Sequence, residues 1–538
     1  MCAPKTTDIA WYGSGQKAPL FEGLDAIDFP ISTDSREVQA YFNQGLLLAY
    51  GFNHAEAARS FDYATRLDSS CAMGYWGFAY VLGPNYNAGM ESDNYERAYK
   101  AIQQAVSLAD QVSEKEQDLI QAMAKRYSPS PPEDRSALDK AYSDAMKELV
   151  KKYPTDTEVA TLYAESLMDM HPWDLWDKQG HPNSWTPTIL EALESVIHLD
   201  PRHPGGHHFY IHAVEASPTP ELGSASAEVL DDDLVPGAGH LIHMPSHIYI
   251  RTGEYHKGTL ANIKAIKADS NYVSLCHAQG AYPLAYYPHN YHFMAGTATL
   301  EGNSYWALKA ATEVRNHADQ EVMQEPGWGT LQHYYTIPYY VAVKFGKWDD
   351  ILNMTNSNPE LSYPEAVRHY ARGMAYLGKQ ELNLARTELT ALQELADLDE
   401  MKEVTVWDIN SVHSLIQIAQ LVLEGEVLAT ETSYDQATKK LRQAADLEDQ
   451  LNYDEPPDWF FSVRHHLAAV QIEAGKYEDA ILTLEEDLKR LPNNGWAHHG
   501  LLQAYRALGM TKQEMAIKDL IAESWATADV KISSSRIK

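Results

Sequence analysis

Histidine is concentrated in one part of the sequence, and its spacing there suits metal coordination. The 90 residues from 203 to 292 hold 11 of the 23 histidines, where an even spread would place roughly four. On a helix, residues three or four apart have Cβ atoms ~5–6 Å apart, so two such rings can reach one cation. Pairs with this spacing include His208/His212, His240/His243, His243/His247 and His289/His292.

These side chains predict a transition-metal site with Cu, Fe or Zn as the cofactor, because imidazole is a ligand for all three. Seven imidazoles exceed the needs of one tetrahedral ion, so either two ions bind or the surplus rings orient the ligands. Histidines that only hydrogen-bond inside the protein are the alternative. Glu165 and Glu215 are candidate ligands or general bases, and the thioether of Met244 is a weaker candidate ligand for copper. The metal-ligand pool is His208, His212, His240, His243, His247, His289 and His292.

A repeated sequence frame indicates which elements position these residues. In its clearest copy, Gly475-Lys476-Tyr477 is followed by Ala480, Leu484 and Pro492. Parts of the frame recur at Gly253-Glu254-Tyr255, at Tyr434-Ala437-Leu441 and at His54-Ala57-Phe61. Small residues allow two helices to cross closely, glycine ends a helix, and proline prevents its continuation. This frame resembles the tetratricopeptide repeat, a helix–turn–helix unit of 34 residues.

A closer resemblance involves two histidine-rich segments. The stretches 203–215 (HPGGHHFYIHAVE) and 239–249 (GHLIHMPSHIY) are similar to those of large bacterial tetratricopeptide-repeat proteins. The pieces 165–173 (ESLMDMHPW) and 454–457 (DEPP) are similar too. This resemblance covers most of the chain and implies no established activity.

The repeats predict an all-α fold, because strand patterns are nearly absent. We expect a right-handed α-solenoid of roughly ten helix pairs with a concave groove lined by the first helix of each pair. The expected boundaries are an irregular arm at 1–33, a superhelix at 34–525 with histidine-rich central repeats at about 156–350, and a tail at 526–538.

The repeat frame places the histidines in phase. Counting the glycine that closes each first helix as position 15, His240, His243 and His247 take positions 2, 5 and 9. His208 and His212 take positions 5 and 9 of the preceding repeat. His289 and His292 take positions 2 and 5 of the following one. These positions share one helical stripe, which the resemblance places on the groove side. Pro245 and Pro288 either bend these helices or lie in their first turns.

Other side chains predicted to line the same groove would contact a substrate. Arginines facing a groove in so acidic a protein suit a carboxylate or phosphate ligand, although salt bridges between helices are the commoner use of such arginines. The substrate-groove candidates are Tyr249, His333, Arg368, Arg372 and His465.

Composition excludes several classes of function. The net charge of −32 would repel phosphate, so we expect no nucleic-acid partner. The three cysteines are too few and too scattered for a disulfide framework or a cysteine zinc site. We expect no transmembrane segment, since no run approaches ~18–20 apolar residues. Met1-Cys2 followed by polar residues is typical of a processed lipoprotein, which would be periplasmic or lipid-anchored; otherwise the chain would be cytoplasmic.

No phosphate-binding loop, nucleophile elbow or His-Glu-x-x-His helix is present in the sequence. The leading hypothesis is therefore a metal-binding solenoid, favoured as a metalloenzyme acting on a small molecule or peptide, with hydrolytic and oxidative chemistry both open. The alternatives are a non-catalytic scaffold for a peptide or protein partner, and a protein of metal storage or delivery.

Overall fold

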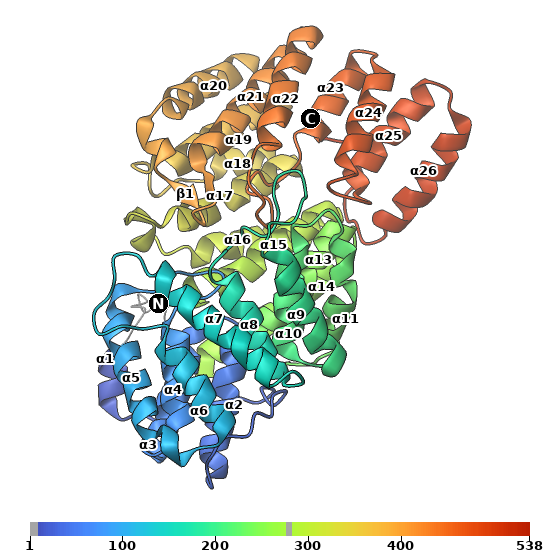
Figure 1. The fold of residues 1–538 in the computed structure, drawn as a ribbon. Helices are drawn as coiled ribbons and strands as arrows, with labels where there is room; N and C mark the ends of the chain where they lie inside the picture. Colours follow the sequence, from blue (N-terminus) through green and yellow to red (C-terminus); the bar gives the residue numbers. More distant parts are fainter. Residues whose placement is uncertain (1–8, 276–281) are drawn as a thin grey trace. The chain divides into compact units, whose positions relative to one another are not determined.

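The computed structural model describes residues 9–275 and 282–538 (Figure 1). Helices make up most of this part of the chain, and its strands are the short antiparallel pair β1 (Thr405–Val406) and β2 (Asn410–Ser411). The predicted all-α class is confirmed. Cys2, on which the lipoprotein prediction rests, lies outside the described residues, as do Cys276 and His277.

The described residues form two compact units, and the predicted superhelix at 34–525 stays a prediction. The first unit contains the described residues up to Ile248 together with Ile263–Tyr287. The second contains Tyr249–Asn262 and Pro288–Lys538. Each is an array of stacked helices and is described separately below.

In the first unit, each helix from α2 to α11 packs on the next along the chain, and alternate helices also touch, as α2 does α4 and α4 does α6. This pattern is typical of stacked helix hairpins. The helices are α1 (Ile9–Ser14), α2 (Arg36–Tyr50), α3 (His54–Leu67), α4 (Ala72–Leu82), α5 (Tyr95–Leu108), α6 (Glu114–Ala124), α7 (Ser136–Lys152), α8 (Thr157–Met168), α9 (Thr186–Leu199), α10 (Pro204–Glu215), α11 (Ser224–Asp231) and α12 (Gly239–His243). Helices α13 (Pro245–Thr252) and α14 (Tyr255–Leu275) contribute residues to both units.

One helix–helix contact in the first unit joins two helices that are far apart in the sequence. Helix α10 packs against α2, more than 150 residues earlier in the chain. Gly205 permits this approach, because a Cβ at this position would lie 2.7 Å from the ring of Tyr50. Helix α10 begins with Pro204 at its first position, and the His203 side chain accepts a hydrogen bond from the Gly206 amide at 2.9 Å. The local sequence thus fixes where α10 starts and which helix it meets.

The second unit repeats the hairpin pattern, with α17 on α19, α19 on α21, α21 on α23 and α23 on α25. Glycines lie where helices cross, so a Cβ at Gly373 would lie 2.5 Å from Leu423 and one at Gly425 would lie 2.7 Å from Leu441. The helices are α15 (Tyr287–Leu300), α16 (Ser304–His317), α17 (Gly329–Lys344), α18 (Trp348–Asn353), α19 (Ser362–Gly378), α20 (Leu382–Ala396), α21 (Val412–Thr430), α22 (Tyr434–Glu448), α23 (Arg464–Glu473), α24 (Tyr477–Asp487), α25 (Gly495–Ala507) and α26 (Thr511–Ser524).

Helix α21 has the length and the apolar composition of a membrane-spanning helix. With 19 residues and a mean hydropathy of 1.2, it is the one described helix long and apolar enough to cross a bilayer, which the sequence survey missed. It packs against α19, α20, α22 and α23, and 61% of its apolar window is buried. This packing is that of a core helix, and the hydropathy signal is weak support for a membrane span.

Candidate metal centre

Five of the predicted ligands gather in the first unit. His208 and His212 lie on α10, His240 and His243 on α12, and His247 on α13. The side chains are buried, with residue exposures of 0–2%. The ring centroid of His208 lies 4.8 Å from that of His212 and 4.9 Å from that of His240. The spacing of three and four residues therefore places these rings together, as the helical periodicity predicts.

Three of these rings form the core of the cluster. Ligand nitrogens of His208, His212 and His240 all lie within 4.8 Å of one another. Nε2 of His208, Nε2 of His212 and both ring nitrogens of His240 are buried and have no hydrogen-bond partner. Nitrogens bound to one tetrahedral zinc at ~2.0–2.1 Å lie about 3.3 Å apart.

The other nitrogens of two of these rings are fixed by hydrogen bonds. Nδ1 of His208 donates to the Tyr50 carbonyl at 2.5 Å, and Nδ1 of His212 donates to Oε1 of Glu215 at 2.7 Å. A ring that donates from Nδ1 has its lone pair on Nε2, which is the atom that can bind a metal. Carbonyl and carboxylate partners of this kind orient the histidine ligands of known metal sites.

Glu215 holds two of the histidines. Its Oε1 accepts from His212, and its Oε2 accepts from Nδ1 of His247. Burial by itself would raise the pKa of Glu215, but the charges and hydrogen bonds of His247 and His212 lower that pKa to about 2. Both oxygens of this carboxylate therefore hydrogen-bond to histidines, and the role of Glu215 as a ligand or general base stays a prediction.

His243 and His247 form a second pair next to this core. Their Nε2 atoms lie 2.9 Å apart and share a hydrogen bond, and the Ser246 hydroxyl lies 3.2 Å from Nδ1 of His243. A one-residue break at Met244 separates the helices that carry them, and Pro245 is the first residue of α13. Pro288 likewise lies in the first turn of α15. Of the two alternatives for these prolines, the structure favours the first-turn position, which costs no hydrogen bond.

The environment keeps the core imidazoles neutral. Burial, with a smaller contribution from neighbouring histidines, lowers the pKa of His208 and of His240 well below the usual value. Burial also lowers the pKa of His212, although Glu215 opposes that shift. A neutral imidazole is the form that coordinates a metal ion.

Aromatic side chains surround the core. The Phe52 ring centroid lies 4.7 Å from that of His208, 5.8 Å from that of His212 and 5.5 Å from that of His240. Tyr86 and Trp173 stack on each other at 5.4 Å, and their ring centroids lie 5.4 and 5.9 Å from that of His212. Sequence analysis missed all three, since they occupy loops outside the repeat frame. Phe52 and Trp173 also have positive φ values, of 56° and 58°, an unusual backbone state that only the structure reveals.

Glu165 on α8 lies in a different network. Its Oε2 accepts from the Tyr80 hydroxyl, and its Oε1 is buried without a hydrogen-bond partner. Burial raises the pKa of Glu165 to about 7, and Tyr80 and Arg126 oppose the shift. Among the contacts of the described residues, Glu165 meets Tyr80 and none of the five histidines.

The remaining predicted ligands belong to the second unit. His289 and His292 lie on α15, where the His292 ring centroid is 5.1 Å from that of Phe460 and 5.5 Å from that of His333. Neither ring nitrogen of His292 has a hydrogen-bond partner. Nδ1 of His333 lies 2.7 Å from the Tyr363 hydroxyl.

The other substrate-groove candidates also lie in the second unit, mostly engaged in ion pairs. Arg368 bonds Glu365 at 2.9 Å and Arg372 bonds Glu388 at 2.8 Å. Both arginines therefore have intramolecular partners, as salt bridges between or within helices require. His465 lies 3.0 Å from Asp487. Tyr249 is buried, with the Lys257 ammonium 5.3 Å from its ring centroid.

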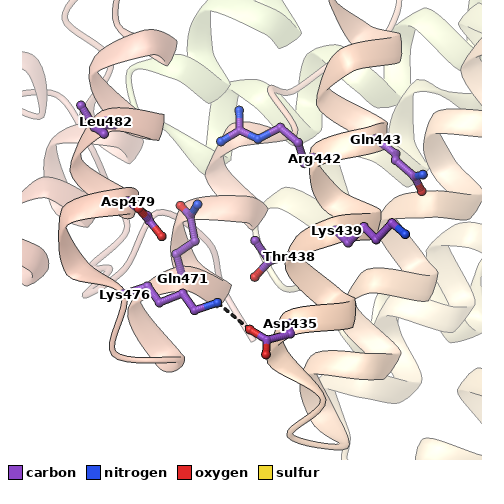
Figure 2. A pocket seen from close by; sticks show the side chains of 9 residues that line it. All are labelled: Asp435, Thr438, Lys439, Arg442, Gln443, Gln471, Lys476, Asp479 and Leu482. Atoms are coloured by element: carbon purple, nitrogen blue, oxygen red, sulfur yellow. Dashed lines mark hydrogen bonds and ion pairs between the residues drawn. The ribbon is translucent and has the colours of Figure 1, made fainter.

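The second unit also has an open depression, lined mainly by polar and charged residues, which holds none of the predicted site residues (Figure 2). Its volume is about 460 Å³, and α22, α23 and α24 supply most of its lining. An ion pair of 2.6 Å between Lys476 and Asp435 crosses one side of it. It contains no histidine, and its charged lining is that of ordinary exposed helix surface.

Comparisons with known proteins assign no family to the chain. No protein-family model matches the chain, and no curated protein matches it. Solved structures that resemble it include the human IFIT1 dimer with m7Gppp-AAAA (12% identity, 91% of each chain, TM-score 0.32). Others are the APC/C hetero-tetramer Cut9–Hcn1 (13% identity, 93% of this chain and 79% of that chain, TM-score 0.29) and yeast Tom70 (12% identity, 90% of each chain, TM-score 0.27). With TM-scores below 0.5, these likenesses carry no argument about this chain.

Proposed function

We propose that the first unit binds a transition-metal ion through Nε2 of His208, Nε2 of His212 and a ring nitrogen of His240. The observation that carries this proposal is the set of buried, unpartnered nitrogens within 4.8 Å of one another. A buried polar atom without a partner costs about 1–3 kcal/mol. An ion bound as proposed would satisfy three of the four such atoms in this cluster.

The surroundings support a metal ion in this role. Two of the three rings have their second nitrogen tied to a carbonyl or carboxylate oxygen, which directs the lone pair of Nε2 toward the cluster. The pKa shifts keep the rings neutral, and Phe52 shields them from water. Imidazole ligands without a thiolate suit zinc, copper or iron.

The number of ligands favours catalysis over a purely structural role. Three protein ligands leave a coordination position for water or substrate, whereas structural zinc sites are closed by four. A metalloenzyme is therefore the form of the proposal that we favour, with His243 and His247 beside the ion as a pair able to hold and pass one proton. Metal storage would use the same ligands without turnover.

Elemental analysis of protein purified without an affinity tag tests the proposal, together with a matched pair of variants. His208→Ala should lower metal affinity at least 10–100-fold, since it removes a direct ligand. His207→Ala is the control, because His207 is adjacent on α10 and its two nitrogens are already engaged, with Ser226 and with the Pro201 carbonyl, each at 2.9 Å.

The proposal predicts a different metal content for the two variants. His207→Ala should keep the parent's metal content, and both proteins should keep their helical circular dichroism. A parent that contains no metal and takes up none of zinc, copper or iron would contradict the proposal. Equal metal content in His208→Ala and the parent would do so too.

A further inference from the structure

The segment that follows α26 packs against the helices of the second unit. Asp529 accepts hydrogen bonds from the amides of Ser304 and Tyr305 at 2.7 and 2.9 Å, which anchors the segment at the start of α16. Residues 531–538 then continue without regular secondary structure. Ser535 and Arg536 are nevertheless buried. The helices around the segment therefore cover Ser535 and Arg536 although this part of the chain has no regular secondary structure.

Arg536 and Lys538 meet acidic side chains of two helices. Nε of Arg536 lies 2.7 Å from Glu426 on α21, and its Nη2 lies 3.2 Å from Glu473 on α23. Lys538 lies 3.4 Å from Glu473. The side chains of Arg536 and Glu426 are only 4% and 3% exposed, so this ion pair is buried. A buried arginine needs such partners, which makes these carboxylates a receptor for a guanidinium group.

Neighbouring residues recognise the backbone and leave space for it. The Ser535 hydroxyl donates to the His465 carbonyl at 2.7 Å, and Lys344 donates to the Ser535 carbonyl at 3.4 Å. A Cβ at Gly500 would lie 3.1 Å from Ser535. At Gly346, where φ is +63°, a Cβ would lie 2.5 Å from Ile537. Two glycines thus provide room for the segment on α25 and at the end of α17.

We propose that this face of α17, α21, α23 and α25 is a peptide-binding site for a Ser-Arg-aliphatic-Lys segment, and that residues 535–538 are its ligand in cis. The side chains recognise the arginine by charge, the serine by hydrogen bonds and the aliphatic residue by shape. A basic partner peptide of the same pattern binds there when the segment is displaced. This site lies in the second unit and does not depend on the metal proposal.

The test keeps the whole protein and cuts one bond. A protease recognition sequence is inserted between Lys531 and Ile532, and the protein is cleaved so that both pieces remain present. A fluorescent peptide with the sequence of residues 532–538 is then added, and its anisotropy is followed. We expect saturable exchange into the cleaved protein, with helical circular dichroism and elution volume unchanged.

Two competitor peptides identify the recognition. A peptide carrying Arg536→Ala should compete at least 10-fold more weakly than the parent peptide, because the buried carboxylate of Glu426 would lose its guanidinium partner. One carrying Lys538→Ala should compete within about 3-fold, since the side chains of that pair are 38% and 31% exposed and solvent screens it. The proposal is overturned if the cut segment never exchanges, if its release unfolds the second unit, or if the Arg536→Ala peptide competes equally.

Discussion

The molecule has two pairs of adjacent histidines, His207-His208 on α10 and His465-His466 on α23, and they differ in how a proposed metal ligand and a structural histidine are surrounded. With Gly475 counted as position 15, His465 takes position 5 of its repeat, as His208 does, and both are fully buried. His465 is bonded on both sides, with Lys344 2.8 Å from Nδ1 and Asp487 3.0 Å from Nε2. His208 is bonded on one side only, and its Nε2 faces other imidazoles.

The difference teaches that burial and repeat phase do not decide the role of a histidine. What decides it is the chemistry of the side chains around the second nitrogen. In the second unit those neighbours are charges of both signs, which complete the hydrogen bonding of the ring. In the first unit they are rings with lone pairs of their own, which a cation can satisfy together.

Removing His465 should separate the two roles with the largest effect. His465→Ala leaves Lys344 and Asp487 buried without their common partner, so we expect the free energy of unfolding to fall by about 3–5 kcal/mol. The metal content of the folded protein should not change. Denaturant titration and elemental analysis of the same preparation check both expectations. Loss of metal in this variant would place His465 among the ligands and remove the comparison.

A smaller effect is expected from the carboxylate that orients the ligands. Glu215→Gln should weaken metal binding about 10–100-fold, because the amide keeps one accepting oxygen for His212 and His247 where the carboxylate has two. The control is Glu165→Gln, a buried carboxylate on α8 that contacts Tyr80. Competition with a metal chelator measures both affinities. Equal losses in the two variants would show that Glu215 has no special role in positioning.

The smallest effect concerns a second-unit histidine that burial keeps neutral. Burial lowers the pKa of His498 on α25 to about 4, and its Nδ1 lies 3.1 Å from the Ser524 hydroxyl. Between the unfolded pKa of about 6.5 and this value, the unfolded state binds the extra proton, so stability falls as pH falls. His498→Asn should reduce this loss by about 1–2 kcal/mol at pH 5 relative to pH 7, with metal content unchanged. Denaturant titrations at the two pH values test this, and identical pH profiles would contradict it.

The sequence predicted the parts of this structure that depend on local spacing. The repeat frame predicted stacked helix hairpins, and steps of three and four residues predicted which histidines share a helical face. The contributions of Tyr50 and Phe52 could not be predicted, because the frame implies contacts only between neighbouring repeats while α10 packs on α2. Nor could the sequence show that both carboxylate oxygens of Glu215 accept hydrogen bonds from histidines, since that depends on the rotamers of three side chains.

The contact between α10 and α2 has a consequence for how the first unit gains and loses structure. In an open array, terminal repeats can fray independently, because each repeat touches only its neighbours. Here the hydrogen bond from His208 to the Tyr50 carbonyl joins positions 158 residues apart. Contacts of such long range form late in folding, since most of the chain between them must first be ordered. The first unit should therefore open as one cooperative block, and its N-terminal helices should exchange their amide hydrogens together with α10.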